Sequence, residues 1–133
     1  MRVFVDTSAL YAILDTDDEN HEKAGDLWKE LVAQEAQLVS SNYILLETLS
    51  LVQHRLGIRA VRSLQEQGVP LLHVEWVDES CHQAGVTAVL TAARCQLSLV
   101  DCVSFQIMRQ VGIRTAFSFD RHFEEQGFER IPE

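Results

Sequence analysis

Three carboxylates of this chain stand alone in apolar segments, and this limits the folds that the chain can adopt. They are Asp6 within Val3–Leu14, Glu47 within Ser40–His54, and Asp101 within Cys95–Met108, each the only charged residue of its segment. An ionised carboxylate is rarely buried unless it is paired or binds a metal ion. No lysine or arginine lies beside these three in the sequence. A fold that brings the acids together therefore needs a cation.

A fourth acid, Asp120, follows the apolar run Ala116–Phe119. If the fold gathers all four carboxylates, they repel one another, and a bound cation must offset that repulsion. Ligand sets made only of carboxylates suit Mg²⁺ or Mn²⁺ better than zinc, which favours histidine and cysteine. The sequence therefore predicts a hard divalent-metal site that contains Asp6, Glu47, Asp101 and Asp120.

Length and composition indicate one globular domain spanning residues 1–133, with 47% hydrophobic and 23% charged residues. The formal net charge of −9, from 20 acidic and 11 basic residues, counts against a nucleic-acid binder and favours a basic partner. Two bound divalent ions would reduce that charge to −5, so the acidity weakens the nucleic-acid interpretation without excluding it.

Cysteine usage and hydropathy indicate a cytoplasmic protein. Cys81, Cys95 and Cys102 are odd in number and lack a CxxC spacing, which favours buried thiols over a disulfide framework or a thiolate zinc site. The N-terminus is typical of a strand ending in an acid rather than of a signal peptide. The uncharged run Ser80–Ala93 is too short and too polar to span a bilayer.

Strand-like and helix-like segments alternate along the chain. We expect strands at Arg2–Val5, Gln37–Ser40, Leu71–Glu75, Arg114–Phe117 and Phe128–Ile131. We expect helices at Ala9–Leu14, Asp18–Gln34, Asn42–Arg55, Ile58–Gln67, Asp78–Ala93 and Val100–Val111. This order predicts an α/β layer fold with a central parallel sheet of four to five strands.

Three local patterns add detail to this prediction. Thr16 and Glu19 have capping-box spacing, which places a helix start before the second helix. The segment Asn42–Arg55 is apolar on nearly every side, so we expect it to be buried on more than one face. Ala84, Ala88 and Ala92 predict a close-packing stripe on the helix that contains them.

The four acids follow or flank the predicted strands. Asp6 ends the first strand, Asp120 lies just past the fourth, Asp101 opens the helix that leads to the fourth, and Glu47 lies in the helix after the second. Sites in open parallel sheets form beyond the carboxyl ends of the strands, near a switch in strand order. All four acids can therefore face one crevice.

This pattern resembles PIN-domain ribonucleases, and most closely the VapC-type toxins of bacterial and archaeal toxin–antitoxin systems. The matching segments are Val5–Leu10, Glu47 in an apolar helix, Ser98–Cys102, Phe117–Phe123 and the closing Gly127-Phe128. The family often has threonine two positions before its last acid, and Ser118 keeps a hydroxyl at that position.

The resemblance implies a three-layer α/β/α fold, RNA cleavage that depends on Mg²⁺ or Mn²⁺, frequent homodimers, and inhibition by a small antitoxin protein. It matches Asp6, Glu47, Asp101 and Asp120 to the acidic cluster, and Thr7 or Ser8, and Ser118, to hydroxyls near the metal. A bound ion can lower the pKa of a water molecule, orient it for in-line attack and offset charge on the phosphodiester. The likeness implies products with 5′-phosphate and 3′-hydroxyl ends.

Simpler interpretations exist for several of these residues. Asp6 and Asp101 can be helix caps, and Asp120 can begin a turn. The five histidines share no metal spacing, and we expect structural or surface roles for His21, His54, His73, His82 and His122. Arg55, Arg59 and Arg62 form the densest basic group, for which surface pairing is the ordinary interpretation and contact with RNA phosphates the alternative.

Three alternative functions stay open. The first is a PIN nuclease of RNA processing without an antitoxin, and the second is a PIN module that binds RNA or protein without catalysis. The third is a phosphatase with an aspartyl nucleophile, which fits poorly because the turn after Asp6 lacks a second aspartate and no lysine lies near the other acids.

Overall fold

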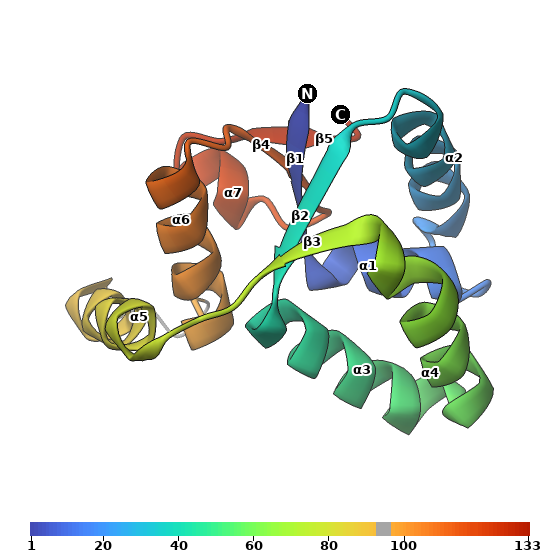
Figure 1. Ribbon diagram of the computed structural model, residues 1–133, viewed down its shortest axis with the longest axis horizontal. Helices are drawn as coiled ribbons and strands as arrows, with labels where there is room; N and C mark the ends of the chain where they lie inside the picture. Colours follow the sequence, from blue (N-terminus) through green and yellow to red (C-terminus); the bar gives the residue numbers. More distant parts are fainter. Residues whose placement is uncertain (93–96) are drawn as a thin grey trace.

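The computed structural model describes residues 1–92 and 97–133, and its centre is a parallel β-sheet (Figure 1). The strands of the described chain are β1 (Arg2–Val5), β2 (Gln37–Ser41), β3 (Leu72–Glu75), β4 (Thr115–Phe117) and β5 (Glu129–Ile131). They form one five-stranded sheet in the order β3-β2-β1-β4-β5, and every pairing is parallel. The predicted parallel sheet is confirmed.

The central strand β1 is buried on both faces. Val3, Phe4 and Val5 are each fully buried, as expected for a parallel strand that helices cover on both sides. Phe4 pairs with Val39 of β2 on one side and with Ala116 of β4 on the other. A run of consecutive apolar residues, rather than an alternating pattern, therefore encodes this strand.

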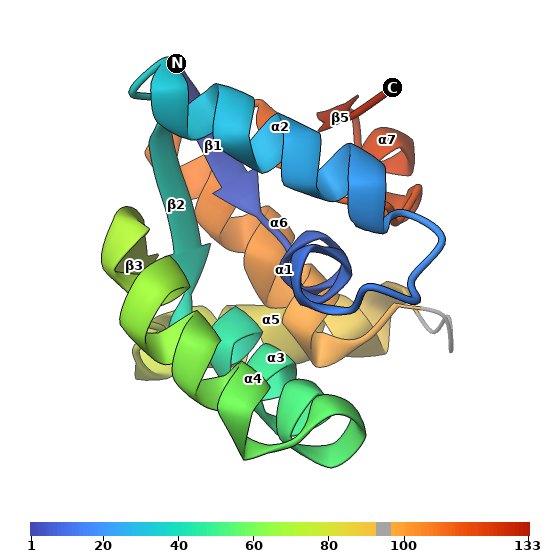
Figure 2. The ribbon, with the colours of Figure 1, turned by 90° about the vertical axis from the view of Figure 1, so that its right-hand side faces the viewer.

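Helices flank the sheet on both sides, which confirms the predicted α/β/α layers (Figures 1 and 2). They are α1 (Thr7–Leu14), α2 (His21–Ala33), α3 (Asn42–Leu56), α4 (Ile58–Ser63), α5 (Glu79–Ala92), α6 (Leu99–Val111) and α7 (His122–Glu125). Helices α1 and α2 lie on one side, and α6 and α7 lie on the other. None of the helices in the described ranges has the length and apolarity needed to cross a membrane.

The order of the strands creates a switch point between β1 and β4. After β1 the chain builds β2 and β3 on one side of the sheet, and it then returns to place β4 and β5 on the other side. Loops from neighbouring strands diverge at such a point and leave room for a site at the carboxyl ends of the strands. The ends of β1 and β4 are joined here by a hydrogen bond from the Asp6 N–H to the Phe117 carbonyl, 3.0 Å long.

The predicted capping box before α2 is wrong. Helix α2 begins at His21, and its N-cap Asn20 makes no capping hydrogen bond through its side chain. The side chains of Asp15 and Asp18 instead accept hydrogen bonds from backbone N–H groups two residues further on. Such local bonds compete with helix formation, so this acidic segment forms turns.

Two predictions about helix packing are also wrong. Only Ile44, Thr48 and Val52 of α3 are buried, while Leu46 is 68% exposed, so α3 packs through one face. On α5 the buried positions are Cys81 and Gly85, and Ala88 of the predicted alanine stripe is exposed. In both helices, position in the fold overrides local composition, because each lies against the molecule on one side only.

Gly85 allows α5 to approach α6 closely. A Cβ atom at this position would lie 2.5 Å from Cγ2 of Val103 on α6, closer than carbon atoms can pack. The contact matters for function because α6 bears Asp101 in its first turn. Cys81 and Cys102 are buried free thiols, as predicted, whereas Cys95 and the predicted helix end at Ala93 lie outside the described residues.

Candidate metal centre

Asp6 lies at the junction of β1 and α1 and is 6% exposed. It caps α1, as the simpler interpretation expected, because its side chain accepts a hydrogen bond from the Ser8 N–H, 3.4 Å away. The same oxygen, Oδ2, accepts hydrogen bonds from the Ser8 hydroxyl at 2.8 Å and the Ser118 hydroxyl at 2.9 Å. These hydrogen bonds therefore all go to Oδ2, and no described residue donates to Oδ1, which is left for another role.

Burial raises the pKa of Asp6 from its ordinary value of 3.8 to about 6. The hydrogen bonds from Ser8 and Ser118 oppose this rise because they stabilise the carboxylate, whereas the nearby charge of Asp101 adds to it. An acid in this environment gains from a bound cation, which offsets both the burial and the repulsion.

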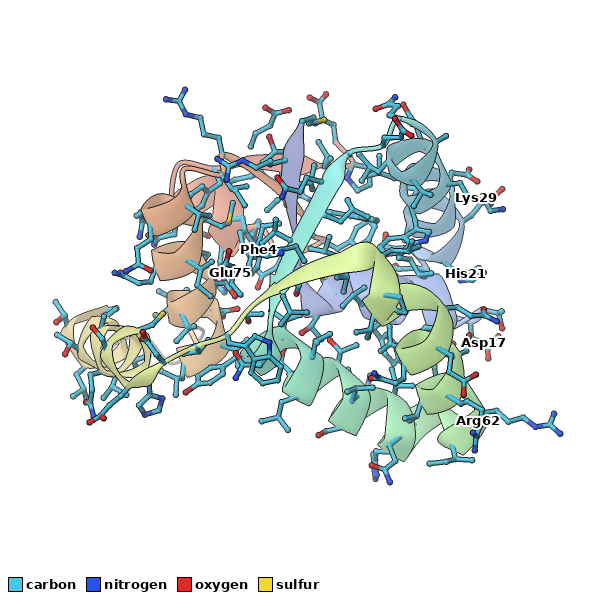
Figure 3. All side chains as sticks on the ribbon, viewed as in Figure 1. Phe4, Asp17, His21, Lys29, Arg62 and Glu75 are labelled. Carbon is cyan, nitrogen blue, oxygen red and sulfur yellow. The ribbon has the colours of Figure 1, made fainter. Side chains whose placement is uncertain are left out.

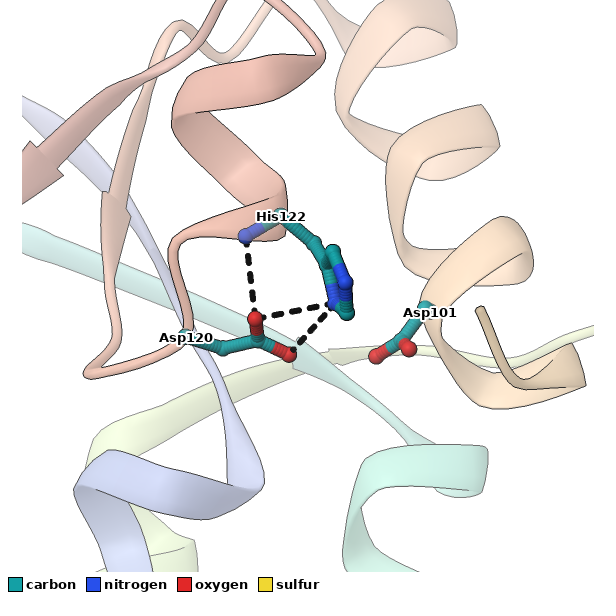
Figure 4. A group of neighbouring side chains, drawn as sticks. All are labelled: Asp101, Asp120 and His122. Carbon is teal, nitrogen blue, oxygen red and sulfur yellow. Dashed lines mark hydrogen bonds and ion pairs between the residues drawn. The ribbon is translucent and has the colours of Figure 1, made fainter. Parts of the chain in front are cut away.

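Asp101 lies in the first turn of α6 and forms a capping box with Ser98. The Asp101 N–H donates to the Ser98 hydroxyl, and the Ser98 N–H donates to Oδ2 of Asp101, both at 3.1 Å. Partial burial is the main cause that raises the pKa of Asp101, and repulsion from Asp120 adds to it. Figure 4 shows the Asp101 carboxylate beside Asp120 and His122. Asp101 thus both caps α6 and lies near a second predicted acid, Asp120.

Asp120 lies in the turn between β4 and α7. Its backbone N–H donates to the Ser118 hydroxyl at 3.0 Å, and its Oδ1 accepts from the backbone N–H of His122 at 2.9 Å. Ser118 is fully buried and contacts both Asp6 and Asp120, so one hydroxyl links two of the predicted acids. Asp120 also begins a turn, as the simpler interpretation expected.

The structure gathers three of the four predicted acids. The charge of Asp101 raises the pKa of Asp6, and the charge of Asp120 raises the pKa of Asp101. Repulsion therefore connects the end of β1, the start of α6 and the turn after β4. Within the described residues, Asp101, Asp120 and His122 each offer a ligand atom within 4.8 Å of the others. No lysine or arginine in the described ranges forms an ion pair with these three acids.

The predicted hydroxyl residues differ in their contacts. The hydroxyls of Ser8 and Ser118 lie 3.2 Å apart, and both donate to Asp6. Thr7 is buried, and its hydroxyl accepts a hydrogen bond from Thr48 of α3 at 3.2 Å, which ties α1 to α3. The contacts favour Ser8 and Ser118 as groups that orient a carboxylate, and Thr7 as a packing residue.

Glu47 is exposed on α3, and it is not part of the group formed by Asp101, Asp120 and His122. Its neighbour Thr48 is fully buried and bonded to Thr7, the residue after Asp6, which holds this part of α3 near the site. Its role as a metal ligand stays a prediction.

His122 is the residue that reasoning from the sequence missed. Its ring Nδ1 lies 3.0 Å from Oδ1 and 3.3 Å from Oδ2 of Asp120 (Figure 4). The side chain is 17% exposed, so the expectation of an ordinary structural or surface role overlooked its position in the acidic group. Its position two residues after Asp120, in a turn leading to the apolar Phe123, is the sequence signal that could have indicated it.

The donor set fits a hard divalent ion. Carboxylates from three elements lie close together, and burial disfavours the charged form of Asp6 and Asp101. Among the described residues, no lysine or arginine forms an ion pair with them. Mg²⁺ and Mn²⁺ prefer such oxygen ligands, and either ion would offset the repulsion. Asp101 and Asp120 could hold the ion together, with Asp6 beside them.

The PIN domain profile matches residues 3–129, and the chain therefore belongs to the PIN-domain family. The chain is similar to the 23S rRNA-specific endonuclease VapC20 of Mycobacterium tuberculosis, strains CDC 1551/Oshkosh and H37Rv. The identity is 31% over 130 residues, which cover 97% of this chain and 97% of VapC20. The crystal structure of VapC20, described as a toxin that cleaves the sarcin–ricin loop, matches with a TM-score of 0.85 over 95% of each chain.

Two further solved structures share the fold at lower identity. FitAcB from Neisseria gonorrhoeae matches with a TM-score of 0.68 and 16% identity, over 98% of this chain and 96% of that chain. VapBC2 from Rickettsia felis, bound to a DNA fragment from its promoter, matches with a TM-score of 0.72 and 11% identity, over 98% and 97%. At these identities the likeness is evidence for the fold alone.

Proposed function

We propose that this protein is an endoribonuclease that uses Mg²⁺ or Mn²⁺ to hydrolyse RNA phosphodiester bonds. The observation that carries the proposal is the gathering of Asp6, Asp101 and Asp120 at the switch point of the sheet, without a lysine or arginine partner among the described residues. Similarity to the endonuclease VapC20 supports the same activity.

In the proposed mechanism, a bound Mg²⁺ or Mn²⁺ would supply a water molecule of lowered pKa and would offset charge on the phosphodiester. Asp101 and Asp120 would hold the ion, and the Ser98 N–H keeps one oxygen of Asp101 in place. Within the described residues Oδ1 of Asp6 stays available, because the three hydrogen bonds from Ser8 and Ser118 all go to Oδ2. These bonds orient the carboxylate before substrate binds, and such preorganisation lowers the barrier.

We further propose that the substrate is ribosomal RNA. VapC20 is described as specific for 23S rRNA and as cleaving the sarcin–ricin loop. The 31% identity extends over nearly the whole of both chains, and the two backbones match with a TM-score of 0.85. We propose a toxin role in the cytoplasm on the same ground, because VapC20 is described as a toxin.

A toxin of this kind requires an inhibitor, and the charge of the chain indicates its chemistry. The net charge of −9 and the acidic group favour a small antitoxin that places arginine or lysine near the carboxylates, where it displaces or mimics the ion. We also propose that the active protein is a homodimer, as the family resemblance implies.

Cleavage of ribosomal RNA tests the proposed activity. Purified protein should cleave ribosomes or sarcin–ricin loop fragments with Mg²⁺ or Mn²⁺ and stop in EDTA. Asp6→Asn or Asp101→Asn should lower the rate at least about a hundredfold, which corresponds to a barrier increase of about 2.7 kcal/mol. A matched control is Asp78→Asn, which changes an exposed aspartate that accepts from the Cys81 N–H at the start of α5. Full activity in EDTA, or in both site variants, would place catalysis elsewhere.

Co-expression tests the proposed partner. The protein alone should arrest growth, and co-expression with a small neighbouring upstream reading frame should relieve the arrest and yield a co-purifying complex. A protein that cleaves RNA in vitro but is harmless when expressed alone, with nothing that co-purifies, would favour an RNA-processing nuclease without an antitoxin.

A further inference from the structure

We propose that His122 is a direct ligand of the bound ion, through Nδ1, and that it makes this site prefer Mn²⁺ over Mg²⁺. The inference rests on the metal site of the proposed function and adds a nitrogen donor to its carboxylates. Mg²⁺ is bound almost entirely through oxygen, whereas imidazole nitrogen suits transition-metal ions better. A single histidine in the site would therefore shift the choice between the two ions.

The spacing of the three side chains fits ligands of one ion. Two ligand atoms about 2.1 Å from an octahedral ion lie about 3.0 Å apart when adjacent and about 4.2 Å apart when opposite. Nδ1 of His122 lies 3.0 Å from Oδ1 of Asp120, and all three ligand atoms of the group, including that of Asp101, lie within 4.8 Å. Small side-chain movements suffice to close the group around an ion.

The position of His122 between two carboxylates favours an ion over a simple hydrogen bond. Nδ1 approaches both oxygens of Asp120, at 3.0 Å and 3.3 Å, and a ring nitrogen of His122 lies within 4.8 Å of an Asp101 carboxylate oxygen. A single N–H donates along one direction only, so it cannot neutralise both carboxylates. The side chains of Asp101, Asp120 and His122 would together hold an ion bound between them.

Aromatic packing holds His122 in this position. The next residue, Phe123, is fully buried and packs edge-to-face against Phe105 of α6, with ring centroids 5.1 Å apart. Phe105 lies one turn after Asp101 on the same helix, so the contact between the two rings fixes the separation of His122 and Asp101. Supported ligands of this kind are what a metal site requires.

Pulsed electron paramagnetic resonance of bound Mn²⁺ tests the proposal directly, because it detects nitrogen bonded to the ion. The protein must carry no histidine tag. Wild type should show ¹⁴N coupling, and His122→Gln should lose it and bind Mn²⁺ at least about tenfold more weakly, with a smaller change for Mg²⁺. His73→Gln is the matched control, since exposed His73 contacts Glu75 at 3.1 Å and lies on β3. This variant should keep the coupling.

Each outcome of the resonance experiment decides whether His122 is a ligand of the ion. Bound Mn²⁺ without ¹⁴N coupling in wild type, or coupling that persists in His122→Gln, overturns the inference and leaves RNA cleavage to be judged on its own. The wild-type spectrum is decisive even if His122→Gln does not fold, and His122→Asn serves as a second variant. Nitrogen coupling in a protein that cleaves no RNA would uphold the ligand and refute the proposed function.

Discussion

Replacing Asp6 by asparagine should stabilise the metal-free protein at neutral pH, although it removes a proposed ligand. Burial raises the pKa of Asp6 to about 6, against an ordinary value of 3.8 that also applies to the unfolded chain. Between these two values the folded protein binds more protons than the unfolded chain, so the free energy of unfolding falls as pH rises. Above about pH 6 Asp6 is ionised in the folded protein as well, and the loss in free energy of unfolding reaches its full size.

The magnitude follows from the pKa shift. At pH 7.5, where Asp6 is ionised in both states, the shift lowers the free energy of unfolding by about 3 kcal/mol, at about 1.4 kcal/mol per pKa unit. At pH 4.5 Asp6 is largely protonated in the folded protein, and the same two pKa values give a loss of only about 1 kcal/mol. Asparagine keeps an oxygen that can accept the hydrogen bonds of Ser8 and Ser118, at a loss of up to about 1 kcal/mol. We therefore expect a net gain of about 2–3 kcal/mol at pH 7.5. That corresponds to a melting temperature about 7–10 °C higher for 133 residues.

Thermal melting in EDTA at pH 4.5 and pH 7.5 measures this effect. Asp78→Asn is the control, because it makes the same change at an exposed helix start and so accounts for the lost charge–dipole interaction with the helix. The gain of Asp6→Asn over this control should shrink by about 2 kcal/mol at the lower pH. An Asp6→Asn gain that is absent at pH 7.5, or the same at both pH values, would refute the reasoning that burial of this acid destabilises the metal-free fold.

Three other variants test the site and its support. Asp101→Asn should also melt higher than wild type in EDTA, because burial raises the pKa of this acid. Its melting temperature should rise less than that of wild type in a Mn²⁺ titration, and an equal rise would mean that Asp101 is not a ligand. Ser118→Ala should raise the pKa of Asp6 further by removing a 2.9 Å hydrogen bond, so the acidic limb of the pH–rate profile should move to higher pH, and an unmoved limb would contradict this. Gly85→Ala should lower the free energy of unfolding in urea by about 1–3 kcal/mol, because its Cβ would lie 2.5 Å from a side-chain carbon of α6. Gly25→Ala is the control and should be neutral or stabilising, because nothing lies within 4 Å of its Cβ. Equal effects of the two substitutions would refute the packing argument.

Much of the fold could be predicted because its signals are local. The apolar run Val3–Val5 indicates a strand covered on both faces, and the alternation of such runs with helical periodicity indicates parallel layers. Lone acids in apolar segments indicated Asp6, Glu47 and Asp101, and Asp120 was added because it follows an apolar run. The structure brings Asp6, Asp101 and Asp120 near one another and leaves Glu47 exposed. These features depend on residues that are close in the chain.

The sequence by itself determined the order of the strands and helices, the parallel class of the sheet, and which acids needed an explanation. Only the tertiary structure decided which groups meet: the Ser118 hydroxyl on Asp6, the His122 ring on Asp120, and the exposed position of Glu47 on α3. The physical reason is that electrostatic and hydrogen-bond energies depend on distance in space. The packing of strands and helices sets that distance, and no local pattern encodes it.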